Sequence, residues 1–312
     1  MMQLILGGAG FIGSAMARRL HNPVVYDALT YAGRRENLTD VEHVFVKGDI
    51  LDIKSLETVI EEYRPEVVFN FAAQTHVDRS IADPHPFLQT NVQGTLNILE
   101  LARRHRFRYV HVSTDEVYGE QEADESSPLR PSSPYSASKA AADMFVFAYV
   151  RTYGVDAFIV RPSNNYGPRQ FPEKLIPKSL LRMLAGKEVP IYGDGKQVRD
   201  WIHVEDTARV IASLVDKGEP GRVYNIPGGQ LATNIEIVNT IAEIAGIEPK
   251  LKFVADRPGH DRFYRMSTTL KYEVTPLREG LRKTVRWYLD NKWWWEPLLQ
   301  DKFYGEDESW RS

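Results

Sequence analysis

The stretch Gln3-Leu4-Ile5-Leu6-Gly7-Gly8-Ala9-Gly10-Phe11-Ile12-Gly13 begins the chain with a short apolar run that passes directly into a glycine-rich loop. Residues 14–20 then have a helical pattern, so the order is strand, glycine loop and helix. In this context Gly7 makes the turn, Gly10 lets the backbone approach a pyrophosphate, and Gly13 allows close helix packing. The stretch therefore predicts a dinucleotide-binding fold.

An acidic residue ends the second predicted strand. Val24-Val25-Tyr26 is followed by Asp27, which stands 20 residues after Gly7. A carboxylate at this place can accept hydrogen bonds from both ribose hydroxyls of an adenosine, and it repels a 2′-phosphate. The alternative is a glycine turn with an unrelated Asp, but strand, spacing and acid agree. The expected cofactor is therefore NAD in preference to NADP.

Strands and helices alternate in the residues that follow. Strands are predicted at 44–47 and 67–71, with an amphipathic helix at 53–63 between them. This alternation indicates an α/β protein with a Rossmann-type doubly wound parallel sheet, covered by helices on both faces. Ligands of such sheets bind beyond the carboxyl ends of the strands. The residues expected there are Gly7, Asp27, Asp49, Ala72, Ala73 and Thr114.

Two adjacent carboxyl groups follow the strand predicted at 108–112. They belong to the sequence Ser113-Thr114-Asp115-Glu116-Val117-Tyr118-Gly119. Neighbouring acids repel each other when both are ionised, so one pKa should rise, and the pair can then divide into an acid and a base near neutral pH. A helix cap followed by two acids at a helix N-terminus explains the same residues.

A second candidate site lies in Tyr135-Ser136-Ala137-Ser138-Lys139. On a helix Tyr135 and Lys139 are at i and i+4 and share a face. The ammonium is therefore expected to lower the pKa of the phenol and make it a usable base.

The composition changes after Pro162. The polar segment 163–174, rich in Gly and Pro, is interpreted as a binding loop. Strands are predicted at 189–191, 199–204 and 223–226, and helices at 175–185, 234–245 and 277–291. The expected division is a nucleotide-binding domain at 1–162, which later segments near 196–227 rejoin, and a smaller, interleaved substrate lobe at 163–312. The run Trp293-Trp294-Trp295 is assigned to packing or interface surface.

Helices predicted at 88–104 and from near Ser136 are candidates for pairing across a two-fold axis, as a homodimer. The second of them carries Val146, Tyr149 and Val150. Solvent-facing amphipathy explains the pattern as well.

His76 is either a structural histidine or a substrate contact.

The composition excludes several classes of protein. The chain has 312 residues, 43% of them hydrophobic and 26% charged, with a formal net charge of −3 and no cysteine. This charge argues against a general nucleic-acid or membrane-surface binder. The absence of cysteine excludes disulfides, thiolate catalysis and Cys-ligated zinc, and no metal is expected. With neither a signal sequence nor an apolar run of about 18 residues, a cytoplasmic protein is expected.

Five further motifs resemble one family closely, the dTDP-glucose 4,6-dehydratases among the extended short-chain dehydrogenases/reductases. They are His76-Val77-Asp78-Arg79-Ser80, Ser113 to Gly119, Ser163-Asn164-Asn165-Tyr166-Gly167-Pro168, Phe171-Pro172-Glu173-Lys174-Leu175-Ile176-Pro177 and Asp256-Arg257-Pro258-Gly259-His260-Asp261. The chain departs from the family at Gln74, Thr75, Phe263 and Ser267.

The resemblance implies NAD as cofactor and dTDP-glucose as substrate. It implies that Tyr135, with Thr114 and Lys139, takes the proton of the sugar 4-hydroxyl, while Glu116 takes the C5 proton and Asp115 protonates the leaving 6-hydroxyl. The implied cofactor-binding residues are Gly7, Gly10, Phe11, Ile12, Gly13, Asp27, Asp49, Ile50, Ala72, Ala73, Tyr135 and Lys139. The implied substrate-binding residues are His76, Thr114, Asn165, Glu173, Lys174, Arg199, Asn234, Arg257 and His260; for Glu173, pairing with Lys174 is the alternative.

Three rival functions remain. A dehydratase of UDP-glucose would use the same residues. A nucleotide-sugar 4-epimerase needs Tyr135 and Thr114 but nothing in place of Asp115 and Glu116. A scaffold that only senses NAD has no need of Thr114, Tyr135 and Lys139.

Overall fold

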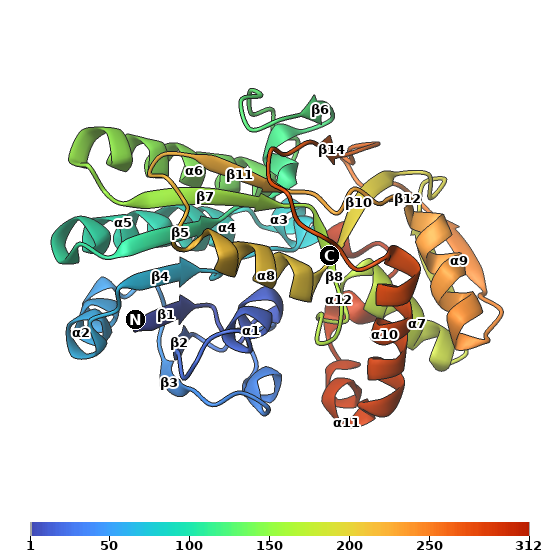
Figure 1. The fold of residues 1–312 in the computed structure, drawn as a ribbon. Coiled ribbons are helices and arrows are strands. Elements are labelled where there is room, and N and C mark those ends of the chain that lie inside the picture. Colours follow the sequence, from blue (N-terminus) through green and yellow to red (C-terminus); the bar gives the residue numbers. More distant parts are fainter. Residues whose placement is uncertain (1, 312) are drawn as a thin grey trace.

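The computed structural model describes residues 2–311, and in that range the largest sheet has seven strands (Figure 1). Every pair of neighbours in it runs parallel. In spatial order the strands are β11 (Val223–Ile226), β7 (Ala157–Pro162), β5 (Arg108–Val112), β4 (Val67–Asn70), β1 (Gln3–Leu6), β2 (Val24–Asp27) and β3 (Val44–Lys47). The predicted doubly wound parallel sheet is confirmed.

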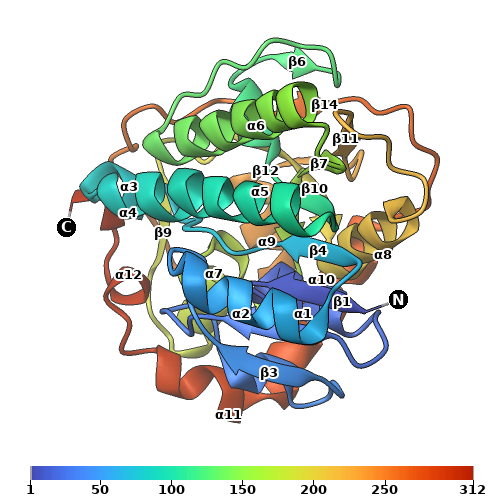
Figure 2. The same cartoon turned by 90° about the vertical axis from the view of Figure 1, so that its left-hand side faces the viewer.

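Helices cover both faces of this sheet. On one face α2 (Ile53–Tyr63), α5 (Gly94–His105) and α6 (Pro134–Tyr153) lie side by side (Figure 2), and on the other α1 (Phe11–Ala17) packs against α8 (Val204–Leu214). Side chains of β1 alternate between the faces: Ile5 belongs to the apolar cluster under α1 and α8, Leu4 and Leu6 to the cluster under α2 and α5. A parallel sheet buried on both sides requires such continuous apolar strands.

The strand order reverses between β1 and β4. From β1 the chain continues outward to β2 and β3, whereas β4 leads in the other direction to β5 and β7. The loops after β1 and β4 therefore meet at the carboxyl edge. Gly7 has φ +72°, and a Cβ there would lie 2.4 Å from the amide nitrogen of Ala72. Only glycine fits this crossing, which leaves a crevice between the two loops.

The second lobe, to the right of the main sheet in Figure 1, has two small sheets and a group of helices, and a third small sheet, of β6 (Glu122–Ala123) and β14 (Arg265–Met266), lies at the top of that view. The core of the second lobe joins residues of three helices, including Leu180, Ile241 and Val285. The two sheets of this lobe consist of β8 (Asn164–Tyr166), β10 (Val198–His203) and β12 (Leu231–Thr233); and β9 (Val189–Tyr192) and β13 (Leu251–Val254). The helices are α7 (Leu175–Leu184), α9 (Asn234–Ala245), α10 (Leu277–Asp290), α11 (Lys292–Trp295) and α12 (Lys302–Gly305).

The remaining elements are short. They are α3 (Val77–Ala82), α4 (His85–Phe87), the π-helix η2 (Leu88–Gln93), and the 3₁₀ helices η1 (Arg35–Leu38), η3 (Asp115–Tyr118), η4 (Glu296–Leu298) and η5 (Ser309–Arg311). The helix predicted at 88–104 is thus wrong in its first six residues, which form a π-helix. There the side chain of Asn91 hydrogen-bonds both backbone groups of Gln74 and the hydroxyl of Ser138.

Three other expectations need correction. The segment 163–174 is not all loop, because β8 within it pairs in parallel with β10. For the same reason only part of the range 196–227 rejoins the main sheet: β11 pairs with β7, and α8 covers one face, but β10 belongs to the separate sheet. The first predicted helix begins three residues early, at Phe11, with Gly10 as its N-cap.

The tryptophan run ties the two lobes together, as expected for packing surface. Trp294 is 1% exposed, and its indole N–H donates to Asn37 at 2.8 Å, while Trp293 is 53% exposed.

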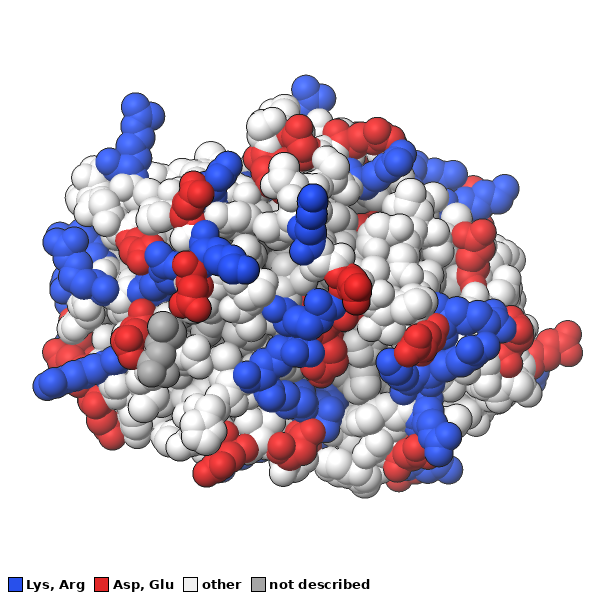
Figure 3. Space-filling model, in the orientation of Figure 1, with Lys and Arg blue, Asp and Glu red and all other residues white. Residues whose placement is uncertain are grey.

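Acidic and basic side chains lie beside one another over the face in Figure 3. None of the helices within residues 2–311 combines the length and the apolar character needed to cross a membrane.

Candidate active site

A pocket of about 320 Å³ opens at the carboxyl edge of the main sheet, where the strand order reverses. Every residue expected to bind the cofactor lines it. These are Gly7, Gly10, Phe11, Ile12, Gly13, Asp27, Asp49, Ile50, Ala72, Ala73, Tyr135 and Lys139. The catalytic candidates Thr114, Asp115 and Glu116 line the same pocket. The site thus joins residues from the ends of several strands, which is how open α/β sheets bind ligands.

The glycine loop leaves room for a phosphate group. A Cβ on Gly13 would lie 2.3 Å from the carbonyl oxygen of Gly7, and one on Gly10 would lie 3.2 Å from that oxygen. The loop passes directly into α1, which begins at Phe11. Backbone N–H groups at a helix N-terminus favour an anion, so this cradle fits the pyrophosphate of a dinucleotide.

Asp27 stands at the end of β2 and is 7% exposed. Its Oδ2 accepts a hydrogen bond from the N–H of Ala9 at 2.9 Å, and its Oδ1 accepts one from the N–H of Leu29 at 2.8 Å. These bonds fix the carboxylate and leave each oxygen a lone pair for a ribose hydroxyl. Gly33 packs against it, since a Cβ there would lie 2.5 Å from Oδ1.

Both interpretations of the Thr-Asp-Glu sequence apply to this site. Thr114 is the N-cap of η3, and its hydroxyl accepts from the N–H of Glu116 at 3.3 Å. The same hydroxyl donates to Oδ1 of Asp115 at 3.1 Å. The cap therefore holds the two acids in place at the wall of the pocket.

The two acids have different electrostatic surroundings. Asp115 is 4% exposed, and its Oδ2 has no hydrogen-bond partner among the described residues. Burial, aided by the charge of Glu116, raises the pKa of Asp115 well above its usual value. Burial also raises the pKa of Glu116, but Arg257, Arg199 and Lys174 oppose that rise. Both pKa values therefore rise, where a rise in one was predicted, and the rise is the larger for Asp115.

Tyr135 and Lys139 share one face of α6, which begins with a capping box formed by Ser133 and Ser136. Burial and the charge of Glu116 raise the pKa of Tyr135, while a hydrogen bond with Thr114 opposes the rise. The expected lowering of this pKa by Lys139 is not found in the folded chain. The ammonium of Lys139 instead donates to the carbonyl of Val112 at 2.7 Å, and burial lowers its own pKa to about 8.

Asn165, Glu173 and Lys174 line the far side of the pocket. Oδ1 of Asn165 is buried and has no hydrogen-bond partner among residues 2–311, so it remains available to a ligand. Lys174 donates to the carbonyl of Thr75 at 2.9 Å. Glu173 forms an ion pair with Arg79 at 2.9 Å, whereas pairing with Lys174 was the alternative to a sugar-facing role.

The other five substrate candidates do not line this pocket. They are His76, Arg199, Asn234, Arg257 and His260. Arg199 and Arg257 are nevertheless close enough to Glu116 to oppose the rise in its pKa. They extend the site beyond the acids as a positively charged region.

The contacts of His76, Asn234 and His260 are with neighbouring side chains and backbone. Nδ1 of His76 accepts from the N–H of Arg79 at 3.4 Å and so caps α3, which is a structural contact. Nδ1 of His260 lies 2.5 Å from Asp256. Asn234 lies 3.5 Å from the side chain of Gln197, which in turn donates to Asp256 at 3.0 Å.

Several lining residues were missed from the sequence. They are Tyr31, Gly33, Thr90 and Gln170. The signal for Gly33 was its place shortly after Asp27, where only a small residue fits. Thr90 lies in the π-helix, which helical periodicity does not reveal.

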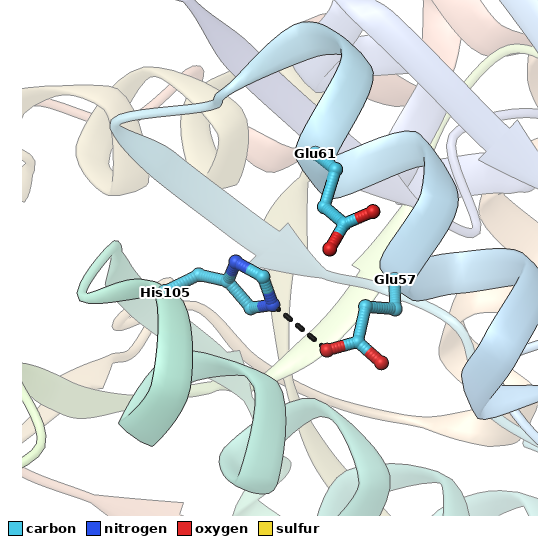
Figure 4. A group of neighbouring side chains, drawn as sticks. All are labelled: Glu57, Glu61 and His105. Carbon is cyan, nitrogen blue, oxygen red and sulfur yellow. Dashed lines mark hydrogen bonds and ion pairs between the residues drawn. The ribbon is translucent and has the colours of Figure 1, made fainter.

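One group of metal-ligating side-chain types lies outside the pocket (Figure 4). Ligand atoms of Glu57 and Glu61 on α2 and of His105 on α5 lie within 4.8 Å of one another. Glu57 already pairs with His105 at 2.9 Å and with Arg104 at 2.6 Å. Glu57 and His105 are thus members of a half-buried ion-pair cluster, next to the exposed Glu61.

Comparison with known proteins agrees with this geometry. Residues 3–227 match the NAD dependent epimerase/dehydratase family. The chain is 45% identical to a dTDP-glucose 4,6-dehydratase of Neisseria meningitidis, over 96% of each chain, and 44% identical to one of Escherichia coli K12, over 98% of this chain and 97% of the other.

Comparison with solved structures agrees with the comparison of sequences. A dTDP-glucose 4,6-dehydratase from Streptomyces venezuelae, determined with NAD bound, superposes with a TM-score of 0.92 at 44% identity, over 96% of this chain and 100% of the other. A UDP-glucose 4-epimerase from Thermotoga maritima superposes with a TM-score of 0.88 at 32% identity, over 94% of this chain and 100% of the other. The chain therefore belongs to the NAD dependent epimerase/dehydratase family and, within it, to the dTDP-glucose 4,6-dehydratases.

Proposed function

We propose that this protein converts dTDP-glucose to dTDP-4-keto-6-deoxyglucose, with NAD as its cofactor. The observation that carries the proposal is the pair Asp115 and Glu116 beside Tyr135 in one pocket. Removing water from C5 and C6 of a hexose requires both an acid and a base at that end of the sugar. Asp115, whose pKa burial raises, next to Glu116, for which three cations oppose the rise, can supply both.

In the proposed reaction each of these groups moves one proton. Tyr135 takes the proton of the sugar 4-hydroxyl, and Thr114, hydrogen-bonded to the phenol, stabilises the phenolate. The C4 ketone acidifies the C5 proton, which Glu116 removes, while Asp115 protonates the departing 6-hydroxyl. When bound, NAD supplies a hydride acceptor for C4 and a hydride donor for C6, with no net redox change.

The nucleoside diphosphate provides the anchor for the substrate. Arg199 and Arg257 present planar guanidinium groups, which match phosphate bidentately, and Lys174 adds a third cation to the same region. Asn165, Asn234 and His260 complete the polar side of this region. Binding energy gained there positions the hexose at the acids, because the anchor is remote from the bonds that react.

The test is to incubate the purified protein with dTDP-glucose and, separately, with UDP-glucose. We expect 4-keto-6-deoxy product, detected by its absorbance in strong alkali, from dTDP-glucose. Product from UDP-glucose alone would assign a different nucleotide. Formation of a C4 epimer without a keto sugar would instead favour the 4-epimerase, the rival supported by the structural likeness to UDP-glucose 4-epimerases.

Asp27 leads to a prediction about cofactor choice. The wild-type protein should bind NAD more tightly than NADP, because a 2′-phosphate would face the Asp27 carboxylate. Asp27→Asn should weaken NAD binding about tenfold or more, the worth of a charge-assisted hydrogen bond, and should reduce the discrimination against NADP. Titration calorimetry of both variants with both dinucleotides measures this. Equal affinity of the wild type for NAD and NADP would contradict the role of Asp27.

We also propose that the protein is a homodimer through the outer faces of α5 and α6. Val146 and Tyr149 of α6, named for this helix in the sequence, are buried in the apolar cluster between the helices and the sheet. The exposed apolar residues of α6 are instead Met144 (48%), Phe145 (36%) and Tyr153 (48%), and Leu88 on the adjoining η2 is 59% exposed. Met144→Glu combined with Phe145→Glu should convert the dimer to a monomer in analytical ultracentrifugation, with Trp293→Glu as an exposed aromatic control. A wild-type monomer would exclude the proposal.

A further inference from the structure

The helix α6, which carries Tyr135 and Lys139, also carries the buried carboxylate of Asp143. Asp143 stands one turn after Lys139 and is 0% exposed. Its Oδ2 accepts hydrogen bonds from the hydroxyl of Ser113 at 3.0 Å and from Nε of Arg161 at 3.0 Å, with Nη2 of Arg161 at 2.9 Å. The one carboxylate thus joins α6 to the end of β5 and to β7.

The same network holds the far end of η3. Nη1 of Arg161 donates to the hydroxyl of Tyr118 at 2.7 Å, and that hydroxyl donates to Asn225 at 2.9 Å. Tyr118 is the last residue of η3, while Ser113 stands two residues before its first. The segment with Thr114, Asp115 and Glu116 is therefore fixed on both sides by groups that meet at Asp143.

Asp143 also interacts electrostatically with Lys139. Burial lowers the pKa of Lys139, and the negative charge of Asp143 opposes that lowering. Other titratable groups are coupled to this pair. His111 on β5 interacts with Lys139, and its Nε2 lies 3.4 Å from Oδ1 of Asp143, while Arg161 on β7 pairs with Asp143. Tyr135, one turn before Lys139 on α6, interacts with Asp115 and Glu116 of η3.

We propose that Asp143 is a positioning residue for the reaction: it fixes the acid segment against α6 and balances the charge of Lys139. The proposal rests on the functions given above to Tyr135, Lys139 and the two acids. Stability alone gives little reason for such a group, because a buried ion pair often adds no net stability over apolar residues.

The first variant, Asp143→Asn, keeps the shape and the bond from Ser113 but leaves Arg161 buried without its anion. That cost can unfold the protein. The decisive variant is therefore the double Asp143→Asn with Arg161→Gln, which removes both charges of the Asp143–Arg161 ion pair together. Only Lys139 then loses a counter-charge, and that loss is the effect under test. Glutamine still has an N–H to donate to Tyr118.

The double variant should fold with a Tm close to that of the wild type. We expect kcat for dTDP-glucose to fall roughly tenfold to 100-fold, because small displacements of reacting groups have effects of that size. KM should stay within about twofold, since the diphosphate anchor is untouched.

The pH profile separates a positioning role from a structural one. Wild-type turnover should decline as pH rises through about 8, where Lys139 loses its proton. Without Asp143 the cation is less favoured, so the decline should begin at lower pH. In Arg161→Gln alone, which retains the charge of Asp143, the decline should not move to lower pH.

A matched control is Asp156→Asn, which removes the half-exposed carboxylate paired with Arg108 at the opposite end of β5. It should change neither kcat nor the pH profile. A folded double variant with wild-type kcat and pH profile would overturn the proposal. If the wild type itself makes no keto sugar, the proposed function fails instead, so the two failures are distinguishable.

Discussion

Replacing Tyr135 with Phe should lower turnover of dTDP-glucose roughly 100-fold or more, the usual contribution of a general base. The substitution removes only the hydroxyl that hydrogen-bonds with Thr114. The ring, 7% exposed and packed edge-to-face against Phe87 with centroids 6.3 Å apart, should stay in place. Steady-state kinetics should show the loss in kcat, with KM and Tm near those of the wild type.

Tyr149→Phe provides the matched control on the same helix. Tyr149 is 8% exposed, and its hydroxyl donates to Glu100 on α5, outside the pocket. Its loss removes one hydrogen bond, about 1 kcal/mol of stability, and should leave kcat unchanged. Equal turnover in Tyr135→Phe and Tyr149→Phe would exclude Tyr135 as the base.

The second large effect concerns the adjacent acids. Asp115→Asn and Glu116→Gln each keep the shape of the side chain but lose its proton transfer. Oxidation at C4 depends on Tyr135 and Thr114, so both variants should still reduce bound NAD. Elimination should stall, and each variant should accumulate the absorbance of reduced nicotinamide while making at least about 100-fold less keto sugar.

Solvent deuterium distinguishes the two variants. Glu116→Gln lacks the base for C5, so recovered substrate and intermediate should carry no deuterium there. Asp115→Asn retains that base and lacks only the acid for the 6-hydroxyl, so exchange at C5 should continue. This expected division agrees with the surroundings of the two acids, because burial raises the pKa of Asp115 strongly, whereas Arg257, Arg199 and Lys174 oppose the rise for Glu116.

Glu122→Gln is the control for this pair. It removes an exposed carboxylate shortly after η3, where Glu122 pairs with Arg265 at the surface. Its turnover should match the wild type, because exposed pairs contribute little. Wild-type product formation by either acid variant, or the absence of reduced nicotinamide in both, would show that the two acids do not divide the work in this way.

The sequence by itself determined those features that short-range geometry fixes. The glycine loop, the apolar strands and the helical periods at 53–63 and 234–245 gave the parallel sheet and its order of elements, because strand and helix periods differ. Asp115 and Glu116 are neighbours in the chain, and Tyr135 and Lys139 are one helical turn apart. Their proximity therefore required no tertiary contact.

Tertiary structure decided what depends on burial and on contacts between distant parts of the chain. Periodicity gave no sign that Arg199 and Arg257 would lie near Glu116. Nor did it indicate that Glu173 would form its ion pair with Arg79. The burial of Tyr135, which raises its pKa, could not be seen in the sequence either. The junction of Ser113, Asp143 and Arg161 joins three elements at one carboxylate. Desolvation and Coulomb interactions act through space, so only the folded arrangement sets their sign and size.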